Sequence, residues 1–153
     1  MANLSNLLEV SAILDPLEAD NRQHVLRTLA QIVAAQSDLD ARDVFEAVME
    51  RERLGSTGVG DGVAIPHVQM SGIDRPIGAF ARVNRACDFE AIDDRPCDLV
   101  FMLVAPLSEG GDHLRALAQV ARTFRDPRLR AALRQGEPGA VALLLGTEHG
   151  AAA

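Results

Sequence analysis

Two stretches near the start of the chain have the apolar spacing of amphipathic helices. Between about residues 21 and 36, apolar side chains recur at steps of three and four, which places them on one helix face. These residues are Val25, Leu26, Leu29, Ile32 and Val33. A second helix is predicted from Asp40, a suitable N-cap, to about Leu54, and it ends at Gly55. Residues 1 to 18 predict a short helical turn and a brief strand that stops at Asp15-Pro16.

The middle of the chain predicts β-strands. Val63 to Ile65 is a short apolar strand, and Pro66 is expected to end its ladder because proline has no N–H to donate. Ile77 to Val83 alternates as a strand does, whereas Asp88 to Asp94 indicates a loop or an edge segment. Leu99 to Val104 is apolar without interruption, which is typical of a central strand covered on both faces.

Helical patterns return after this apolar run. A helix is predicted from about Asp112 to Thr123, with Leu114, Leu117, Val120, Ala121 and Phe124 facing inward. Asp126-Pro127 starts a short helix that runs through Leu133, and Val141 to Leu145 forms a last helix or strand. Helices that alternate with strands predict an α/β sandwich, in one domain over residues 1–148 with a flexible tail over 149–153.

Composition narrows the function classes. Over 153 residues, 15 Lys and Arg stand against 22 Asp and Glu, a net charge of −7 that argues against a general nucleic-acid binder and favours a basic protein partner. The two cysteines, Cys87 and Cys97, match no zinc-ligand spacing, so we expect two small buried or half-exposed thiols. No secretory signal or membrane-length apolar run is present, and the cytoplasm is the expected compartment.

A glycine-rich segment carries the candidate chemistry. Four glycines lie within residues 55–62, after the charged helix end Arg51-Glu52-Arg53 and before the apolar strand that leads to His67. Glycines allow positive φ angles and close approach of backbone amides to an anion. A histidine beside such a loop indicates phosphoryl chemistry. The segment matches neither a Walker A sequence nor GxGxxG after a strand, so mononucleotide binding is unsupported.

His67 and His113 differ from the other two histidines. His24 lies among polar neighbours and His149 lies in the tail, so both are expected on the surface. A neutral imidazole at His67 could attack phosphorus if its second nitrogen donates to a carbonyl or carboxylate. His113 belongs to a helix stripe with Leu117, Val120 and Phe124, and could be structural or functional.

Other residues near the loop each have a structural and a functional interpretation. Arg51 could bind phosphate with two N–H groups or be a solvated helix-end residue. Ser56 and Thr57 could brace the turn or offer hydroxyls to phosphate oxygens, and Gly58 belongs to the same phosphate-binding support.

The chain resembles the enzyme IIA proteins of the bacterial phosphotransferase system, fructose/mannitol type, and most closely the nitrogen-related branch, IIA-Ntr. The resemblance rests on three blocks in the family's order: residues 51–67, residues 88–93, and Pro96 to Phe101 followed by His113-Leu114. It implies a compact α/β domain, a mixed sheet of about five strands with helices on both faces in a three-layer sandwich.

The resemblance also implies a function. His67 would accept a phosphoryl group from a small HPr- or NPr-like phosphocarrier, with His113 and Arg51 in the same site and no cofactor or metal. Transport branches pass the phosphate to a IIB protein, whereas the nitrogen branch regulates other proteins, including potassium-handling systems, by its phosphorylation state. No nucleic acid and no membrane insertion are implied.

Departures from the family pattern leave alternatives open. Asp61 stands where Asn is common and adds negative charge near an incoming phosphate, and Cys97 stands where Val is usual. A module that only docks to partners is therefore a second hypothesis, and a sugar-specific IIA that serves a separate IIB is another. A metal hydrolase that uses His67, His113 and Asp112 is a third class, which the histidine spacing does not favour.

Overall fold

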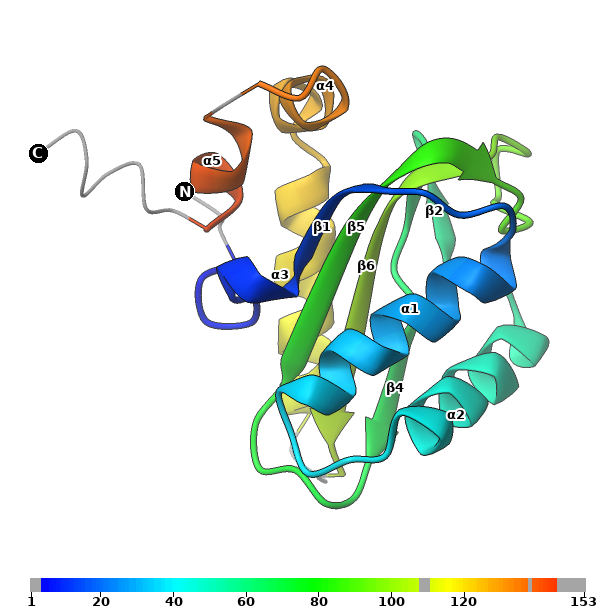
Figure 1. Ribbon diagram of the computed structural model, residues 1–153, viewed down its shortest axis with the longest axis vertical. Coiled ribbons are helices and arrows are strands. Elements are labelled where there is room, and N and C mark those ends of the chain that lie inside the picture. The colour runs from blue at the N-terminus through cyan, green and yellow to red at the C-terminus, as the bar shows by residue number, and fades with distance from the viewer. Residues whose placement is uncertain (1–3, 108–110, 138, 146–153) are drawn as a thin grey trace, which may run out of the picture.

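The computed structural model describes residues 4–107, 111–137 and 139–145, and a mixed β-sheet of six strands forms its centre (Figure 1). The strands are β1 (Ile13–Leu17), β2 (Gly58–Gly60), β3 (Val63–Ala64), β4 (His67–Met70), β5 (Ile77–Cys87) and β6 (Cys97–Pro106). They lie in the order β1-β5-β6-β3-β2, and β4 also pairs with β6. The pair β5–β6 is antiparallel, whereas β1 runs parallel to β5 and both β3 and β4 run parallel to β6.

Strand β6 is the centre of the sheet, as its uninterrupted apolar run predicts. Leu99, Phe101 and Leu103 are buried against one face, and Val100, Met102 and Val104 are buried against the other. The period of two along a strand therefore gives each face its own apolar core. The two cores explain why β6 shows no alternation of polar and apolar residues.

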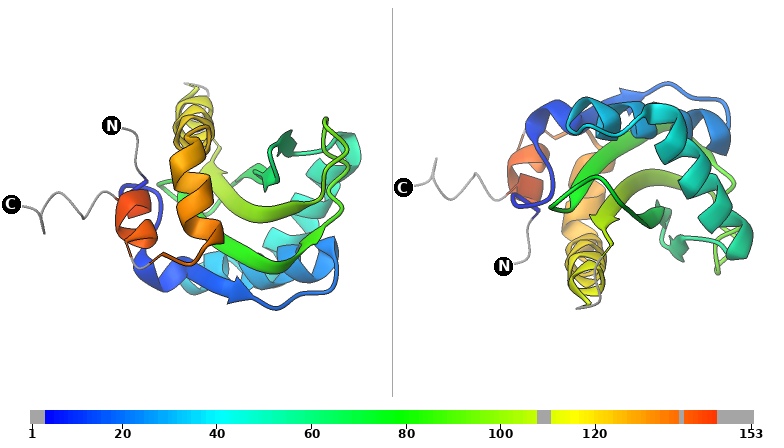
Figure 2. Two further views of the ribbon diagram at one scale, coloured as in Figure 1. Left: turned by 90° about the horizontal axis from the view of Figure 1, so that it is seen from above. Right: turned by 90° about the horizontal axis from the view of Figure 1, so that it is seen from below.

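Helices cover both faces of the sheet, which makes three layers (Figure 2). The helices are α1 (Arg22–Ala35), α2 (Ala41–Leu54), α3 (Asp112–Phe124), α4 (Pro127–Arg134) and α5 (Ala140–Leu145), with a 3₁₀ turn at Val10–Ala12. The first two pack on one face, while α3, α4, α5 and the N-terminal leucines pack on the other. The expected α/β sandwich is confirmed. No helix among the described residues is long and apolar enough to cross a lipid bilayer.

Local capping chemistry sets the helix ends that the sequence predicts. The Asp40 side chain accepts hydrogen bonds from the backbone N–H groups of Arg42 and Asp43, and α2 ends before Gly55. The Asp126 side chain caps α4 in the same way, with Pro127 at the first helical position. These predicted helix starts are confirmed.

Four details differ from the sequence predictions. Pro66 interrupts the ladder without ending it, because its carbonyl still accepts from Leu103 N at 2.9 Å and pairing resumes at His67 in the same register. Pro16 lies inside β1 and does not stop it. The glycine-rich segment contains β2, and the predicted strand at Ile77 extends to Cys87.

The prediction that Leu114 faces inward was wrong. It is 59% exposed, because it lies one position, about 100°, from the stripe that continues through Val120 to Phe124. Phe124 seats α3 on the sheet, with its ring 5.5 Å from the Phe80 ring and stacked on it. The tail at 149–153, His149 and residues 108–110 lie outside the described residues.

Candidate active site

A cavity of about 270 Å³ lies where β4 begins and α3 starts, beside the last turn of α2. Its lining is mostly apolar with a few polar groups, as is usual for binding sites. The lining residues are Arg51, His67, Val68, Gln69, Leu103, Ala105, His113, Leu114 and Leu117. Three residues predicted from the sequence, His67, His113 and Arg51, therefore meet in one cavity although they come from three separate elements.

The backbone around Pro66 orients the His67 ring. His67 Nδ1 lies 2.6 Å from the carbonyl oxygen of Ile65, two residues earlier. A carbonyl only accepts hydrogen bonds, so Nδ1 carries the proton and Nε2 keeps a free lone pair when the ring is neutral. The half-buried imidazole thus keeps its free lone pair on Nε2, and the hydrogen-bond acceptor that fixes the tautomer is the Ile65 carbonyl.

The environment of His67 favours its neutral form. Burial lowers the pKa of His67 below its ordinary value, and the nearby charges of Arg51 and His113 lower it further, although the Ile65 carbonyl acts in the opposite direction. A lowered pKa keeps the ring uncharged at neutral pH. The lone pair on the second ring nitrogen is therefore present in a larger fraction of molecules than in a free histidine.

Arg51 lies in the last turn of α2, where it closes the cavity on the side of the glycine-rich segment. Its Nη1 donates to the carbonyl oxygen of Gly55 at 3.0 Å, which anchors the guanidinium at the helix end. Arg51 takes no part in the ion pairs formed among the described residues. Its positive charge is therefore available to an anion in the cavity.

His113 is the second residue of α3 and lies where the positive end of the helix dipole meets the cavity. Its Nδ1 is buried and has no hydrogen-bond partner among the described residues. A buried ring nitrogen without a partner costs free energy, so such groups are rare unless a ligand or water pairs them. The imidazole thus retains hydrogen-bonding capacity that contacts within the described chain do not use.

Ser56, Thr57 and Gly58 do not line the cavity, and their contacts brace the segment that leads to it. Ser56 Oγ donates to the carbonyl of Phe89 and accepts from Gly58 N at 3.0 Å. Thr57 Oγ1 donates to Glu52 Oε2 at 2.6 Å in the interior. At Gly58 an added Cβ would lie 2.7 Å from the Cβ of Ala91, so glycine permits this close approach.

Glu52 is a buried carboxylate that the sequence reasoning did not single out. Glu52 is 6% exposed, and burial raises the pKa of its carboxyl group. The hydrogen bond from Thr57 and the charges of Arg22 and Arg51 act in the opposite direction. The Arg22 guanidinium lies 3.8 Å away, beyond hydrogen-bond distance. Glu52 thus links α2 to the glycine-rich segment through Thr57.

Gln69 and the apolar lining were also missed. Gln69 follows His67 by two residues, and the period of two along β4 could have placed it on the same face. Its side chain donates to the Pro106 carbonyl at 3.3 Å. Leu103 and Ala105 reach the cavity only through the pairing of β4 with β6, which no local pattern reveals.

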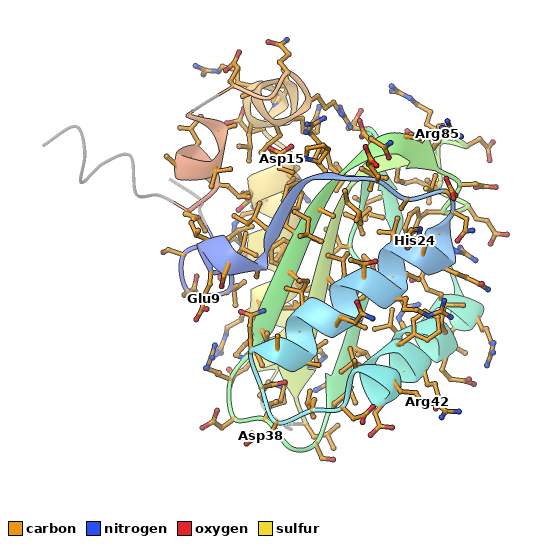
Figure 3. All side chains as sticks on the ribbon, in the orientation of Figure 1. Glu9, Asp15, His24, Asp38, Arg42 and Arg85 are labelled. Carbon is orange, nitrogen blue, oxygen red and sulfur yellow. The ribbon has the colours of Figure 1, made fainter. Side chains whose placement is uncertain are left out.

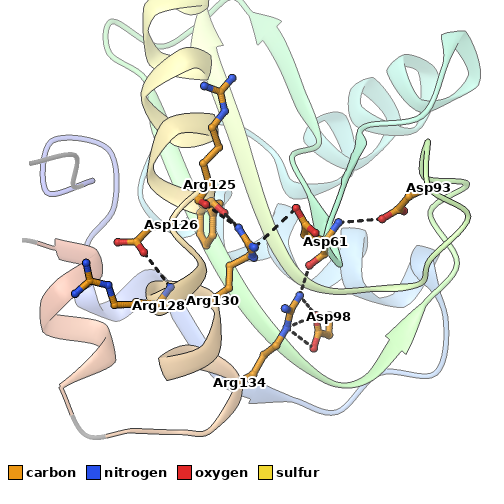
Figure 4. Close-up of polar contacts among 9 residues, drawn as sticks. Asp61, Asp93, Asp98, Arg125, Asp126, Arg128, Arg130 and Arg134 are labelled. Carbon is orange, nitrogen blue, oxygen red and sulfur yellow. Dashed lines mark hydrogen bonds and ion pairs between the residues drawn. The ribbon is translucent and has the colours of Figure 1, made fainter.

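Asp61 does not line the cavity, contrary to the expectation that its charge lies near an incoming phosphate (Figure 4 shows its surroundings). Its carboxylate lies 3.8 Å from the Arg130 guanidinium, and its carbonyl accepts from Arg134 Nη2 at 2.5 Å. Arg134 also binds both carboxylate oxygens of Asp98. Cations of α4 therefore offset the charge of Asp61.

His24 and Asp112 do not line the cavity. His24 lies exposed on α1, where Figure 3 labels it. Asp112, the third residue of the hydrolase hypothesis, is exposed and binds Arg115 at 2.8 Å. The described residues hold no group of three or more His, Cys, Asp or Glu side chains arranged for a metal ion.

The chain is similar to proteins of one family along nearly its whole length. The family model described as "Phosphoenolpyruvate-dependent sugar phosphotransferase system, EIIA 2" matches residues 6–145. A relative named "Nitrogen regulatory protein" from Bradyrhizobium diazoefficiens is 43% identical over 131 residues, 86% of each chain. A relative of the same name from Pseudomonas aeruginosa is 37% identical over 144 residues, covering 94% of this chain and 93% of its own.

Similarity extends to three dimensions. The crystal structure of the nitrogen regulatory protein IIA-Ntr from Neisseria meningitidis superposes with a TM-score of 0.79 at 35% sequence identity. The match covers 84% of this chain and 88% of that one. Sequence and fold therefore agree on the same set of relatives.

Proposed function

The chain belongs to the EIIA 2 family of the phosphoenolpyruvate-dependent sugar phosphotransferase system, and we propose that it carries a phosphoryl group on Nε2 of His67. The hydrogen bond between His67 Nδ1 and the Ile65 carbonyl supports this assignment most directly, because it directs the lone pair to the other ring nitrogen. The family as a whole takes part in phosphotransfer. The residue, the atom and the roles below are our proposal for this chain.

The proposed transfer needs no cofactor. The donor is a phosphohistidine on a phosphocarrier of the HPr or NPr kind. Its N–P bond breaks while the lone pair of His67 Nε2 forms a new N–P bond, and the donor ring nitrogen keeps the electron pair of the broken bond. Arg51 and His113 hold the phosphoryl oxygens, and the apolar wall formed by Leu103, Leu114 and Leu117 limits access of water to the phosphohistidine.

Ser56, Thr57 and Gly58 act indirectly in this proposal. They tie the glycine-rich segment to Phe89, Glu52 and Ala91, and the segment holds Arg51 through the Gly55 carbonyl. We assign these three residues to the support of the site. In the proposal the phosphoryl oxygens contact Arg51 and His113, and the phosphorus is bonded to His67.

The similarity to nitrogen regulatory proteins supports a regulatory role rather than a role in sugar transport. In this proposal the phosphorylation state of His67 is read by downstream proteins, of which potassium-handling systems are one class implied by the resemblance. The docking-only hypothesis drew on the negative net charge and on altered residues such as Asp61 and Cys97. The contacts of Asp61 with α4 weaken the part of it that rests on Asp61.

Replacement of His67 by alanine tests the proposal directly. The protein is incubated with a carrier phosphorylated by its own enzyme I and phosphoenolpyruvate, and label in the chain is measured after acid and after base. We expect wild-type label that is lost in acid and stable in base, and we expect none above background in His67→Ala. His24→Ala is the matched control, because it removes an exposed histidine from α1 and should label as wild type does.

Label of the same stability in His67→Ala would refute the assignment of the acceptor. Wild-type protein that takes no phosphate from the carrier, yet still binds it, would favour the docking-only module. For wild-type protein that takes up label, phosphopeptide mapping locates the labelled residue. Nuclear magnetic resonance then distinguishes phosphorylation at Nε2 from phosphorylation at Nδ1, because the two phosphohistidines differ in chemical shift.

A further inference from the structure

The two cysteines of the chain face each other across the central strands. Cys87 closes β5 and Cys97 opens β6, and they are direct partners in the antiparallel register. Partners in an antiparallel pair point to the same face, and both thiols belong to the core beneath α1 and α2. Both are free.

The spacing of such partners is suited to a disulfide. Directly opposed residues have Cα atoms about 4.5–5.5 Å apart, within the range of about 4.4–6.8 Å found for disulfides. Their Cβ atoms are about 4.5–5.5 Å apart before bonding, so the strands need to approach by about 1 Å. The ladder is irregular between Arg82 and Cys87, so this end of the hairpin is not held by a continuous set of paired residues.

We propose that Cys87 and Cys97 are a modification site, at which a peroxide converts the two thiols to an intramolecular disulfide that closes the loop 88–96. The site lies outside the cavity that contains His67. Its formation is independent of whether His67 carries phosphate, so the two proposals can fail separately.

The loop that this bond closes is the one that supports the glycine-rich segment. The Phe89 carbonyl accepts from Ser56, and Ala91 packs against Gly58. The Asp93 carboxylate accepts from Asp61 N at 3.0 Å. A bond at the base of the loop therefore restricts the motion of all three contacts, and through them the motion of residues 56–61.

The chemistry balances with hydrogen peroxide as the oxidant. The thiolate of Cys87 attacks one peroxide oxygen, which gives a sulfenic acid and hydroxide. The thiolate of Cys97 then attacks the Cys87 sulfur, forms the S–S bond and releases the second oxygen as hydroxide. With the two thiol protons, the products are one disulfide and two water molecules.

Cys87 is the sulfur that peroxide reaches first. It is 5% exposed and lies on a surface hollow lined by residues 20–23 and 86–88, whereas Cys97 is fully buried. Burial raises the pKa of Cys87, and it raises the pKa of Cys97 to about 12. Thiolates are therefore scarce at neutral pH, so the reaction is slow there and accelerates as pH rises. The disulfide is therefore expected to form under prolonged exposure to peroxide.

The test measures mass and free thiols in the folded protein. Reduced protein is exposed to hydrogen peroxide at pH 8, quenched, denatured and alkylated. We expect the intact mass to fall by two hydrogen atoms, both thiols to escape alkylation, and a peptide map to join Cys87 to Cys97. We also expect amide hydrogen exchange at Gly58 and Asp61 to slow by about 3-fold or more in the oxidised form.

Cys87→Ala and Cys97→Ala are the matched variants, and circular dichroism checks that each is folded. Neither should lose two hydrogens, and each should keep one alkylatable thiol or form a sulfenic acid. The proposal is overturned if wild-type protein keeps two alkylatable thiols after peroxide has oxidised an unfolded sample. It is also overturned if peroxide yields a sulfinic acid at Cys87 with Cys97 free, or a disulfide between two chains.

Discussion

At the scale of single residues, one backbone carbonyl decides which ring nitrogen of His67 can react. The Ile65 oxygen accepts a hydrogen bond from the Nδ1–H group, and Pro66 between the two residues restricts the backbone that sets this geometry. Burial and two neighbouring basic side chains keep the ring neutral. In the proposed transfer the nucleophile therefore has no carboxylate partner, and the described residues that line the cavity include no Asp or Glu that would repel a phosphoryl group.

Replacement of Arg51 by alanine should raise the pKa of His67 and slow phosphotransfer. The guanidinium lowers that pKa by repelling the imidazolium, so its removal lets the ring protonate at a higher pH. Loss of its charge-assisted hydrogen bonds to the phosphoryl group should reduce the rate by roughly 10- to 100-fold. Histidine nuclear magnetic resonance titration measures the pKa, and rapid-quench labelling measures the rate.

A lysine variant separates charge from geometry at Arg51, and a substitution of the nearby Arg53 is the control. Arg51→Lys keeps the positive charge, so the His67 pKa should stay close to its wild-type value while the rate still falls, because lysine lacks the planar pair of donors. Arg53→Ala removes an exposed arginine two residues further along the same helix and should change neither quantity. If Arg51→Ala leaves both the pKa and the rate unchanged, Arg51 is not part of the site.

Glu52 should make the free energy of unfolding depend on pH. Burial raises its pKa in the folded protein above the ordinary 4.5, so between those two pKa values the unfolded chain loses the proton first. The stabilisation is complete below pH 4.5 and is lost as pH rises through the folded pKa. Glu52→Gln should flatten this part of the profile and stay within about 1 kcal/mol of wild type at pH 7, because the amide oxygen can still accept from Thr57.

The alanine variant is the contrasting case for Glu52. Glu52→Ala leaves the buried Thr57 hydroxyl without its acceptor and removes the ion-pair partner of Arg22, which should cost about 1–3 kcal/mol. Urea unfolding at pH 4.5 and pH 7 measures both variants. A glutamine variant as unstable as the alanine variant would show that the negative charge, rather than the hydrogen bond, holds the segment.

At the scale of elements, the connection from α2 to β2 depends on close packing at Gly58. An alanine Cβ there would lie 2.7 Å from the Cβ and 2.9 Å from the Cα of Ala91, so one backbone must move. We expect Gly58→Ala to destabilise the protein by about 1–3 kcal/mol and to slow labelling, because the displaced segment carries the Gly55 carbonyl that anchors Arg51. Chemical denaturation and labelling kinetics measure the two effects.

A second substitution and a control sharpen this test. Ala91→Gly removes the clashing Cβ but not the Cα, so the double variant should recover part of the lost stability. Gly139→Ala meets no atom within 4 Å and should leave labelling unchanged. Equal effects at Gly58 and Gly139 would contradict the packing argument.

Helices were predicted well from the sequence because their signals are local. The apolar steps of α1 and α3 and the caps Asp40 and Asp126 all lie within a few residues of the element they define. Strands β2 and β4 escaped prediction because both are short and one is two-thirds glycine. Their pairing partners are β3 and β6, so only the assembled sheet identifies them.

At the scale of the whole molecule, the site exists because α3 returns to the sheet beside β4. His67 and His113 were singled out by the chemistry of their surroundings in the sequence, and the resemblance implied that they lie close together. Neither source could predict that Asp61 turns toward α4, because its partners Arg130 and Arg134 lie about 70 residues later. The distribution of charge over the molecule therefore had to come from the fold.

That distribution leads to a prediction for association with the carrier. The chain has a net charge of −7, whereas the cavity contains Arg51 without an ion-pair partner among the described residues. Under the proposed function, such a field steers a carrier with a basic docking surface, and Arg51 is the group expected to receive its phosphoryl group. We expect kcat/KM for phosphotransfer to fall about 10-fold between low and high salt, while kcat changes little because the transfer occurs in a cavity shielded from bulk ions.

The two rate constants distinguish steering from other effects of salt. Stopped-flow or rapid-quench measurements at several carrier concentrations give both, and sucrose at matched viscosity controls for slower diffusion. A kcat/KM that does not respond to salt would mean that docking is dominated by apolar contacts, such as the exposed Leu114 on the rim of the cavity. A kcat that falls in parallel would place the salt-sensitive interaction at Arg51 itself, and Arg51→Lys would then reproduce the wild-type salt dependence with a lower rate.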